Sequence, residues 1–456
     1  MATAPFFVLS PSSILALIGL VKGAKPVQPA DPALLARLRV DVVIPAYNEG
    51  ATIALCLASL ARQTFKPRSI IVFDDCSKDD TAEVADAFAV ASSQPIRVVR
   101  RRTPMGKTPG LKQAAYESDA DVIFVLDADT ILGTDDYLEK VCAQLYRVPG
   151  IASACGVIHP LRNSDRQRMA ETETVQRLLE ARPQTRVIPA RGYFRGVSKA
   201  ISDFYRDALY HYMQNFMYVG MQNLFGTTMN PVGCAVAYRR DYLIELFESY
   251  AASLGDDLTS SEDIFFGFVF VEEGYHNTQV REVYARTEEP EAHRIPSQLL
   301  LWSSAWLQSA YYFPELLMSP FRALKRFRRE RQNADLRERR KVVDGYREPF
   351  GRQFARRFGR PGGWVTFLAI FEKLSFPAVL IFLMAIGAWE PLAVTVMAEM
   401  VLYMLIIGIF SRHHRVRHIL RGLVATPLRY GTLLFDVVTI IHFLFDVMTG
   451  RNRWRK

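Results

Sequence analysis

The chain has 456 residues, of which 50% are hydrophobic and 23% are charged, so it is long enough for two or three domains and apolar enough for a large core. This composition excludes a disordered chain and a small scaffold held together by disulfides. The formal net charge of +9 is concentrated in residues 321–360, which carry fifteen basic and five acidic side chains. Because the rest of the chain is close to neutral, the sequence has a single basic belt at residues 321–360.

The five cysteines are odd in number, scattered, and never spaced as C-x-x-C: Cys56, Cys76, Cys142, Cys155 and Cys234. This pattern predicts neither a disulfide framework nor a structural zinc site. It fits a reducing compartment.

The part of the chain after residue 39 alternates short β-rich runs with helical patterns. Strands are predicted at residues 40–44, 69–73, 96–99 and 122–126, and helices at residues 52–62, 81–90 and 111–117. Repeated βα units predict an α/β domain with a mainly parallel sheet. In such sheets ligands bind beyond the carboxyl ends of the strands, which is where the polar motifs of this sequence fall.

Carboxylates follow two of the predicted strands. Asp74 and Asp75 end the second strand, and Asp127 and Asp129 follow the fourth. Since side chains alternate along a strand, a spacing of two aims both acids the same way, and a cation would offset their repulsion. Oxygen ligands suit Mg²⁺ or Mn²⁺, and such an ion keeps positions open for diphosphate oxygens. Taken alone, the segments 48–49 and 260–263 are better explained as helix caps than as parts of a binding site.

Together, these motifs resemble the inverting family 2 glycosyltransferases with a GT-A fold, and within them the membrane-integrated branch of cellulose, chitin and hyaluronan synthases and ceramide glucosyltransferase. The resemblance covers about residues 39–310 and implies a Rossmann-like GT-A sheet. The matching segments are 44–49 (the "PAYNE" element), 73–81 ("DDxSxDxT"), Arg101 with 106–107 and 111–114 ("GKAxALN", with Lys112 in place of asparagine), 127–129 ("DxD") and 261–263 ("TED").

The resemblance also implies roles for individual residues. The nucleotide-sugar is expected to bind Tyr47, Glu49, Asp75, Lys107 and Asp127. Asp129, supported by Asp127, is the expected ligand of Mg²⁺ or Mn²⁺, and Asp263, beside Glu262, is the expected catalytic base. Gln298 and Trp302 match the acceptor element "QxxRW", but Leu301 stands where that element has arginine, which weakens the case for processive synthesis.

Long apolar segments close the chain. Residues 364–389 and 392–410 can each cross a hydrocarbon core of about 30 Å, and residues 430–449 form a third candidate that carries Asp436, His442 and Asp446. An apolar stretch at residues 6–21 is expected to be an anchor or an interfacial helix. The basic belt and an arginine-rich loop at residues 412–429 are expected in the cytoplasm.

The sequence therefore predicts four parts: an N-terminal anchor or interfacial helix (1–38), a cytoplasmic GT-A domain (39–295), interfacial helices with the basic belt (296–360), and an α-helical transmembrane region (361–456). The predicted protein is a multi-pass enzyme of the cell membrane, a metal-dependent, inverting hexosyltransferase that moves a sugar from a nucleotide-sugar, expected to be a UDP-sugar, to a growing polysaccharide. Single addition to a lipid acceptor is an alternative, and a non-catalytic nucleotide-sugar receptor is a second. Membrane lipids are expected partners, and nucleic acid is not, because no nucleic-acid-binding motif is visible.

Overall fold

The computed structural model describes residues 10–24, 29–189, 192–254, 261–332, 351–411 and 415–449. In this part of the chain eight strands form one sheet in the order β3-β2-β1-β4-β7-β6-β8-β5. The strands are β1 (Val40–Ala46), β2 (Ser69–Asp74), β3 (Ile96–Arg100), β4 (Val122–Leu126), β5 (Thr130–Leu132), β6 (Ile151–Pro160), β7 (Ala235–Arg239) and β8 (His276–Thr287). The strands predicted from the sequence are thus confirmed, as is the α/β class.

The sheet is parallel where the motifs lie and mixed beyond them. β1 pairs in parallel with β2 and β4, and β2 pairs in parallel with β3. β7 runs antiparallel between β4 and β6, while β6 and β8 are again parallel. The carboxyl ends of β1, β2 and β4 therefore meet at one edge, which is the geometry that gathers the residues after those strands.

Helices cover both faces of the sheet, so its central strands are buried almost throughout. Val42 and Ile44 belong to the core on one face, and Val43 belongs to the core on the other. The helices of this domain are α2 (Pro32–Leu35), α3 (Ile53–Ala61), α4 (Thr81–Ser92), α5 (Lys107–Glu117), α6 (Tyr137–Leu145), α7 (Asn163–Ala170), α8 (Glu173–Ala181), α11 (Arg240–Leu254) and α12 (Glu262–Glu273).

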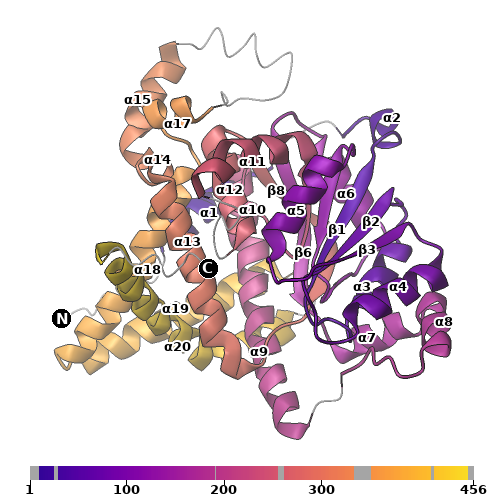
Figure 1. The fold of residues 1–456 in the computed structure, drawn as a ribbon. Helices are drawn as coiled ribbons and strands as arrows, with labels where there is room; N and C mark the ends of the chain where they lie inside the picture. The colour runs from indigo at the N-terminus through magenta and orange to yellow at the C-terminus, as the bar shows by residue number, and fades with distance from the viewer. Residues whose placement is uncertain are drawn as a thin grey trace.

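A second group of helices lies beside the sheet domain and is joined to it by α9 and α13 (Figure 1). α9 (Tyr193–Tyr212), a π-helical turn (Met213–Met217) and α10 (Tyr218–Phe225) follow one another without a break. After β8 and the short turn Ala292–Arg294 come α13 (Ile295–Tyr312), α14 (Pro314–Leu317), α15 (Ser319–Gln332) and α17 (Arg352–Phe358), and then α18 (Gly363–Ala385), α19 (Trp389–Phe410) and α20 (Arg415–Met448).

Among the described residues, α18, α19 and α20 are long and apolar enough to cross a membrane. The expectation of an arginine-rich loop before the third segment is wrong for residues 415–429, because α20 already begins at Arg415 and runs for 34 residues. Leucine and valine between the arginines allow the helix to continue there. Residues 412–414, the C-terminal tail from 450 and the middle of the basic belt at 333–350 lie outside the described residues.

The N-terminal apolar stretch is described from residue 10 onward and forms α1 (Pro11–Lys22). A helix of 12 residues is about 18 Å long, shorter than a hydrocarbon core. α1 packs against α10, where Ala16 is fully buried. Its N-terminal end reaches α18, since Glu372 accepts hydrogen bonds from the backbone N–H and the hydroxyl of Ser12.

Candidate active site

The acids after β4 lie in a turn and not in the strand itself. β4 ends at Leu126, and the Thr130 N–H closes the turn by donating to the Asp127 carbonyl at 3.0 Å. The alternation argument therefore does not apply to Asp127 and Asp129, yet both side chains line the same cavity. The Asp127 N–H donates to the Cys234 carbonyl at 2.9 Å, which fixes the turn against the segment that enters β7.

Lys107, the first residue of α5, connects the turn after β4 to the start of α12. Its Nζ lies 2.8 Å from Asp127 Oδ1 and 2.7 Å from Glu262 Oε1, and it donates to the Gly233 carbonyl at 3.1 Å. Burial alone would lower the pKa of Lys107, but the attraction of the two carboxylates outweighs burial and raises this pKa well above its usual value. The site therefore holds a fixed positive charge.

Asp263 lies in the first turn of α12, beside Glu262. Its Oδ2 accepts from the Gly233 N–H at 3.1 Å and its Oδ1 accepts from the Ser261 hydroxyl at 2.5 Å. Burial, reinforced by the neighbouring charge of Glu262, raises the pKa of Asp263 to about 6, and the Ser261 hydrogen bond acts in the opposite direction. A carboxylate with a pKa just below neutral suits general base catalysis. Ser260, the other residue of the expected cap, lies outside the described residues.

Asp129 is crowded by other carboxylates. Burial raises its pKa well above the usual value, and the charges of Asp127, Glu49 and Glu288 add to the effect. Such crowding is relieved when a cation binds. Among the described residues, no three His, Cys, Asp or Glu side chains are placed to hold a metal ion by themselves. Asp129 and Asp127 together fit a site for a hard divalent cation that takes its remaining oxygen ligands from a diphosphate.

Tyr47 and Asp75 directly follow β1 and β2. Asp75 accepts from Arg101 at 2.9 Å and from the backbone N–H groups of Met105 and Gly106, both at 2.8 Å. In the structure it therefore holds the loop that leads to Lys107. Tyr47 is half exposed beyond the end of β1. The Glu49 carboxylate accepts a hydrogen bond from the Thr52 hydroxyl at the start of α3, and α3 has no side-chain cap of the kind that the capping interpretation requires.

Most of the predicted site residues share one cavity of about 950 Å³. It is lined by Lys107, Asp127, Asp129, Glu262, Asp263, Gln298 and Trp302, whereas Tyr47, Glu49 and Asp75 are not part of its lining. From the carboxylates the cavity continues past α9 and α13 to residues of α1, α18, α19 and α20. The carboxylates after β4 and at the start of α12 and the candidate membrane spans thus border a single continuous space.

Sequence reasoning missed Arg206, which belongs to α9. Its side chain is fully buried, lies 4.5 Å over the ring of Trp302, hydrogen-bonds Gln298, and pairs with Glu289 at 3.3 Å. Leu301, the departure from the acceptor element, is 41% exposed and is not part of the cavity lining. The run Glu288-Glu289 could have been recognised from the sequence as part of the site, because it directly follows β8 just as the other motifs follow their strands. Arg206 lies inside a helix and belongs to no recognisable motif, so the sequence did not indicate it.

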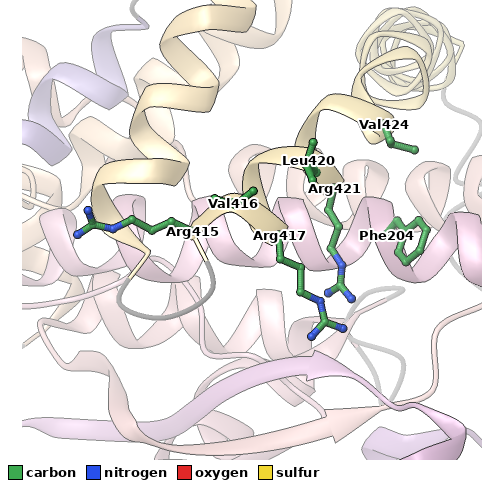
Figure 2. Close-up of a pocket in the computed structure, with 7 residues that line it drawn as sticks. All are labelled: Phe204, Arg415, Val416, Arg417, Leu420, Arg421 and Val424. Atoms are coloured by element: carbon green, nitrogen blue, oxygen red, sulfur yellow. The ribbon is translucent and has the colours of Figure 1, made fainter.

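A second, shallower pocket of about 620 Å³ lies on the arginine-rich start of α20, beside Phe204 of α9. Figure 2 shows the side chains of Arg417 and Arg421 extending in the same direction. Leu420 and Val424 contribute aliphatic side chains to the same pocket. Arg421 pairs with Asp207 of α9. This surface combines guanidinium groups with exposed aliphatic side chains and is separate from the cavity of the acids.

Comparison with known proteins agrees with this geometry. Residues 41–247 match the family model "Glycosyl transferase family 2". An N-acetylglucosaminyltransferase of Azorhizobium caulinodans is 25% identical over 306 residues, which are 66% of this chain and 64% of that protein. An O-antigen chain rhamnosyltransferase of Salmonella typhimurium is 31% identical over 119 residues, which are 26% of this chain and 37% of that protein. The chain thus spans less than two thirds of either relative.

A solved structure resembles the chain over almost its whole length. The mannosyltransferase from Pyrobaculum calidifontis, in complex with GDP-Man and Mn²⁺, covers 95% of this chain and 95% of its own, with a TM-score of 0.50 and 15% sequence identity. At that identity the likeness shows the fold alone, and the fold is the GT-A type that the motifs predicted. Residues 41–247 therefore resemble glycosyl transferase family 2, in a chain that joins this GT-A-like domain to three helices long and apolar enough to span a membrane.

Proposed function

We propose that this protein is a membrane-bound hexosyltransferase that moves a sugar from a nucleotide-sugar to a hydroxyl group of an acceptor in the cavity, with inversion at the anomeric carbon. The observation that carries the proposal is that Asp129, Lys107 and Asp263 line one cavity. Sugar transfer needs three kinds of group, and these residues can supply them: Asp129 a ligand for a divalent cation, Lys107 a fixed positive charge, and Asp263 a base.

The diphosphate leaving group must be neutralised as the glycosidic bond breaks. Asp129, with Asp127, would hold Mg²⁺ or Mn²⁺, and the bound ion would supply this neutralisation. The charged Lys107, 2.8 Å from Asp127, adds a second positive group at the same place. The fold neighbour was solved with GDP-Man and Mn²⁺, which supports the cation and leaves both UDP and GDP donors to be tested.

Asp263 is the proposed base. It would take the proton of the acceptor hydroxyl as that oxygen attacks the anomeric carbon on the face opposite the diphosphate. A single displacement inverts the carbon, so an α-linked donor gives a β-glycoside. Tyr47, Glu49 and Asp75 would bind the nucleotide-sugar, and Asp75 also holds the loop that positions Lys107.

The cavity wall favours an acceptor that comes from the membrane. Because residues of α18, α19 and α20 line the same space as Asp263, we place a lipid acceptor first, ahead of the polysaccharide that the sequence alone favoured. Chain extension of a glycan stays the second candidate, because Trp302 presents an aromatic ring to the cavity and could carry a sugar. In both cases the catalytic domain would be cytoplasmic, with the spans in the cell membrane.

A donor screen on the purified protein tests the proposal. Released UDP and GDP and labelled product are measured with UDP- and GDP-sugars, with Mg²⁺ or Mn²⁺ and after chelation. We expect Asp129→Asn and Asp263→Asn each to lower transfer by about 10²- to 10⁴-fold. Asp86→Asn, the same change at an exposed position of α4, is the control. Wild-type transfer by either site variant would contradict the proposal, and nucleotide binding without turnover of any donor would favour the receptor alternative.

A further inference from the structure

Carboxylates outnumber cations on the cavity lining. Of the described residues that line it, only Lys107, Lys373 and Arg429 are cations, whereas nine are carboxylates. Three of these carboxylates belong to the candidate spans, namely Glu372, Glu399 and Asp436, and the other six belong to the catalytic domain. Behind the lining, Arg206 pairs with Glu289, and Arg166 and Lys199 pair with Glu288. With these cations counted, three carboxylates remain in excess, and a divalent cation at Asp129 would offset two of their charges.

Each cation on the lining already has a carboxylate partner. In α20 and α19, Arg429 and Glu399 form two parallel hydrogen bonds of 2.6 Å, and the Tyr430 hydroxyl donates to Glu399 at 2.7 Å. Lys373 of α18 lies 3.2 Å from Asp436 of α20. At the catalytic end Lys107 is held by Asp127 and Glu262, both within 2.8 Å. The described lining therefore offers no uncommitted cation to an anionic acceptor.

What the lining does offer is hydrogen-bond acceptors beside apolar surface. Carboxylates accept hydrogen bonds from hydroxyl groups, while an ionised phosphate has no proton to donate and is repelled by them. Leu299, Trp306, Phe376, Leu402 and Leu433 form apolar wall between the polar groups. A molecule that matches both features has an uncharged head with free hydroxyl groups and an apolar tail.

We propose that the acceptor is an uncharged amphiphile with a hydroxyl head, such as a lipid alcohol or a neutral glycolipid, and that lipids with a phosphate head are rejected. The inference rests on the proposed function and narrows its acceptor to one chemical class. The new bond joins the head-group oxygen to the anomeric carbon, the hydroxyl proton passes to Asp263, and the nucleoside diphosphate leaves with the electron pair of the broken bond.

Matched pairs of lipids test this in the wild-type protein. Each pair is an alcohol and its phosphate monoester: dioleoylglycerol and phosphatidic acid, ceramide and ceramide 1-phosphate, farnesol and farnesyl phosphate. Transfer of labelled sugar and release of nucleoside diphosphate are both measured in the same micelles. We expect labelled product only from alcohol members. Labelled product from a phosphate member, or release of nucleoside diphosphate without any labelled lipid, overturns the inference. Failure to cleave any donor would instead defeat the proposed function.

A variant tests the charge argument directly. Glu399→Gln removes the carboxylate partner of Arg429 and leaves a cation on the lining, so phosphatidic acid should inhibit this variant about tenfold more strongly than the wild type. Glu390→Gln is the matched control, because it makes the same change at an exposed position of the same helix. Equal inhibition of the two variants would overturn the argument. Thermal unfolding reports whether Glu399→Gln is folded, and the lipid pairs test the inference even if it is not.

Discussion

Asp263 shows how two opposed influences set the pKa of a single side chain. Burial and the charge of Glu262 raise this pKa to about 6, while the Ser261 hydroxyl, 2.5 Å away, stabilises the ionised form and holds the pKa down. The group is therefore ionised at neutral pH and still basic enough to accept a proton. Ser261 lies just before α12, so the same turn that starts the helix also tunes the base.

Transfer should fall as the pH drops through about 6, because protonated Asp263 cannot act as a base. Ser261→Ala removes a hydrogen bond to the charged form, so the pKa of Asp263 should rise and the acid limb of the pH–rate profile should move to higher pH. The measurement is kcat/KM from pH 5 to 8 for both proteins. An unchanged acid limb in Ser261→Ala would assign that limb to another group.

Arg206 joins α9 to Gln298 and Trp302 of α13, the proposed acceptor-binding residues. Arg206→Lys keeps the charge but loses the flat guanidinium over Trp302, so the KM for the acceptor should rise several-fold with little change in the donor KM. Arg239, which stacks over Tyr146 and Tyr242 and has no contact with Trp302 or Gln298, supplies the control Arg239→Lys. Arg206→Leu should instead cost about 3–5 kcal/mol of stability, since it leaves Glu289 buried without its cation. If the acceptor KM is the same in Arg206→Lys and the wild type, Arg206 has only a structural role.

At the scale of elements, α1 is attached by the close approach of two helices. A Cβ added to Gly220 of α10 would lie 2.2 Å from the Ala16 carbonyl oxygen and 2.5 Å from its Cα, so only glycine allows this contact. The contact also brings Ser12 to Glu372 and Ser13 to Tyr212, whose hydroxyls are 2.8 Å apart. Ser12, Ser13, Tyr212 and Glu372 all line the cavity, so the docking of α1 closes part of its wall.

Gly220→Ala should separate α1 from α10 and lower the free energy of unfolding by about 1–3 kcal/mol, because the added carbon meets backbone that cannot move aside. Gly196→Ala in α9 is the control, because a Cβ there has nothing within 4 Å and alanine favours helix. Thermal unfolding and protease cleavage after α1 are the measurements. A Gly220→Ala protein as stable and as resistant as the wild type would show that α1 docks by other contacts.

Elements whose pattern is local were predictable from the sequence, and contacts between distant segments were not. β1, β2 and β4 are mainly apolar runs followed by polar turns, so the strands were predicted to within two residues of their observed ends, and the meeting of the residues after them could also be predicted. The start of α20 was missed because arginines at a predicted membrane boundary suggested a loop. The contact of Arg206 with Trp302 depends on how α9 packs against α13, and no periodicity in either helix contains that information.

At the scale of the whole molecule, the sheet domain and the three candidate spans share the cavity, and α9 and α13 lie between them (Figure 1). α18, α19 and α20 present exposed apolar side chains outward, among them Phe382, Val401 and Ile441. A bilayer around these helices would bring its head groups to the arginine-rich start of α20, where the second pocket lies (Figure 2). The pocket is suited to anionic lipid, since guanidinium groups bind phosphate and aliphatic neighbours contact acyl chains.

Anionic lipid should therefore stabilise the protein through α20. In neutral detergent, added dioleoylphosphatidylglycerol should raise the midpoint of thermal unfolding of the wild type more than dioleoylphosphatidylcholine does, because only the former pairs with the arginines. The double variant Arg415→Gln and Arg417→Gln should lose most of this difference, whereas Arg37→Gln, an exposed arginine of the sheet domain, should keep it. Arg421 is left unchanged in this test because it pairs with Asp207 and supports the packing of α20 on α9. An undiminished response in the double variant would mean that anionic lipid binds elsewhere, with the basic belt at residues 321–360 as the next surface to examine.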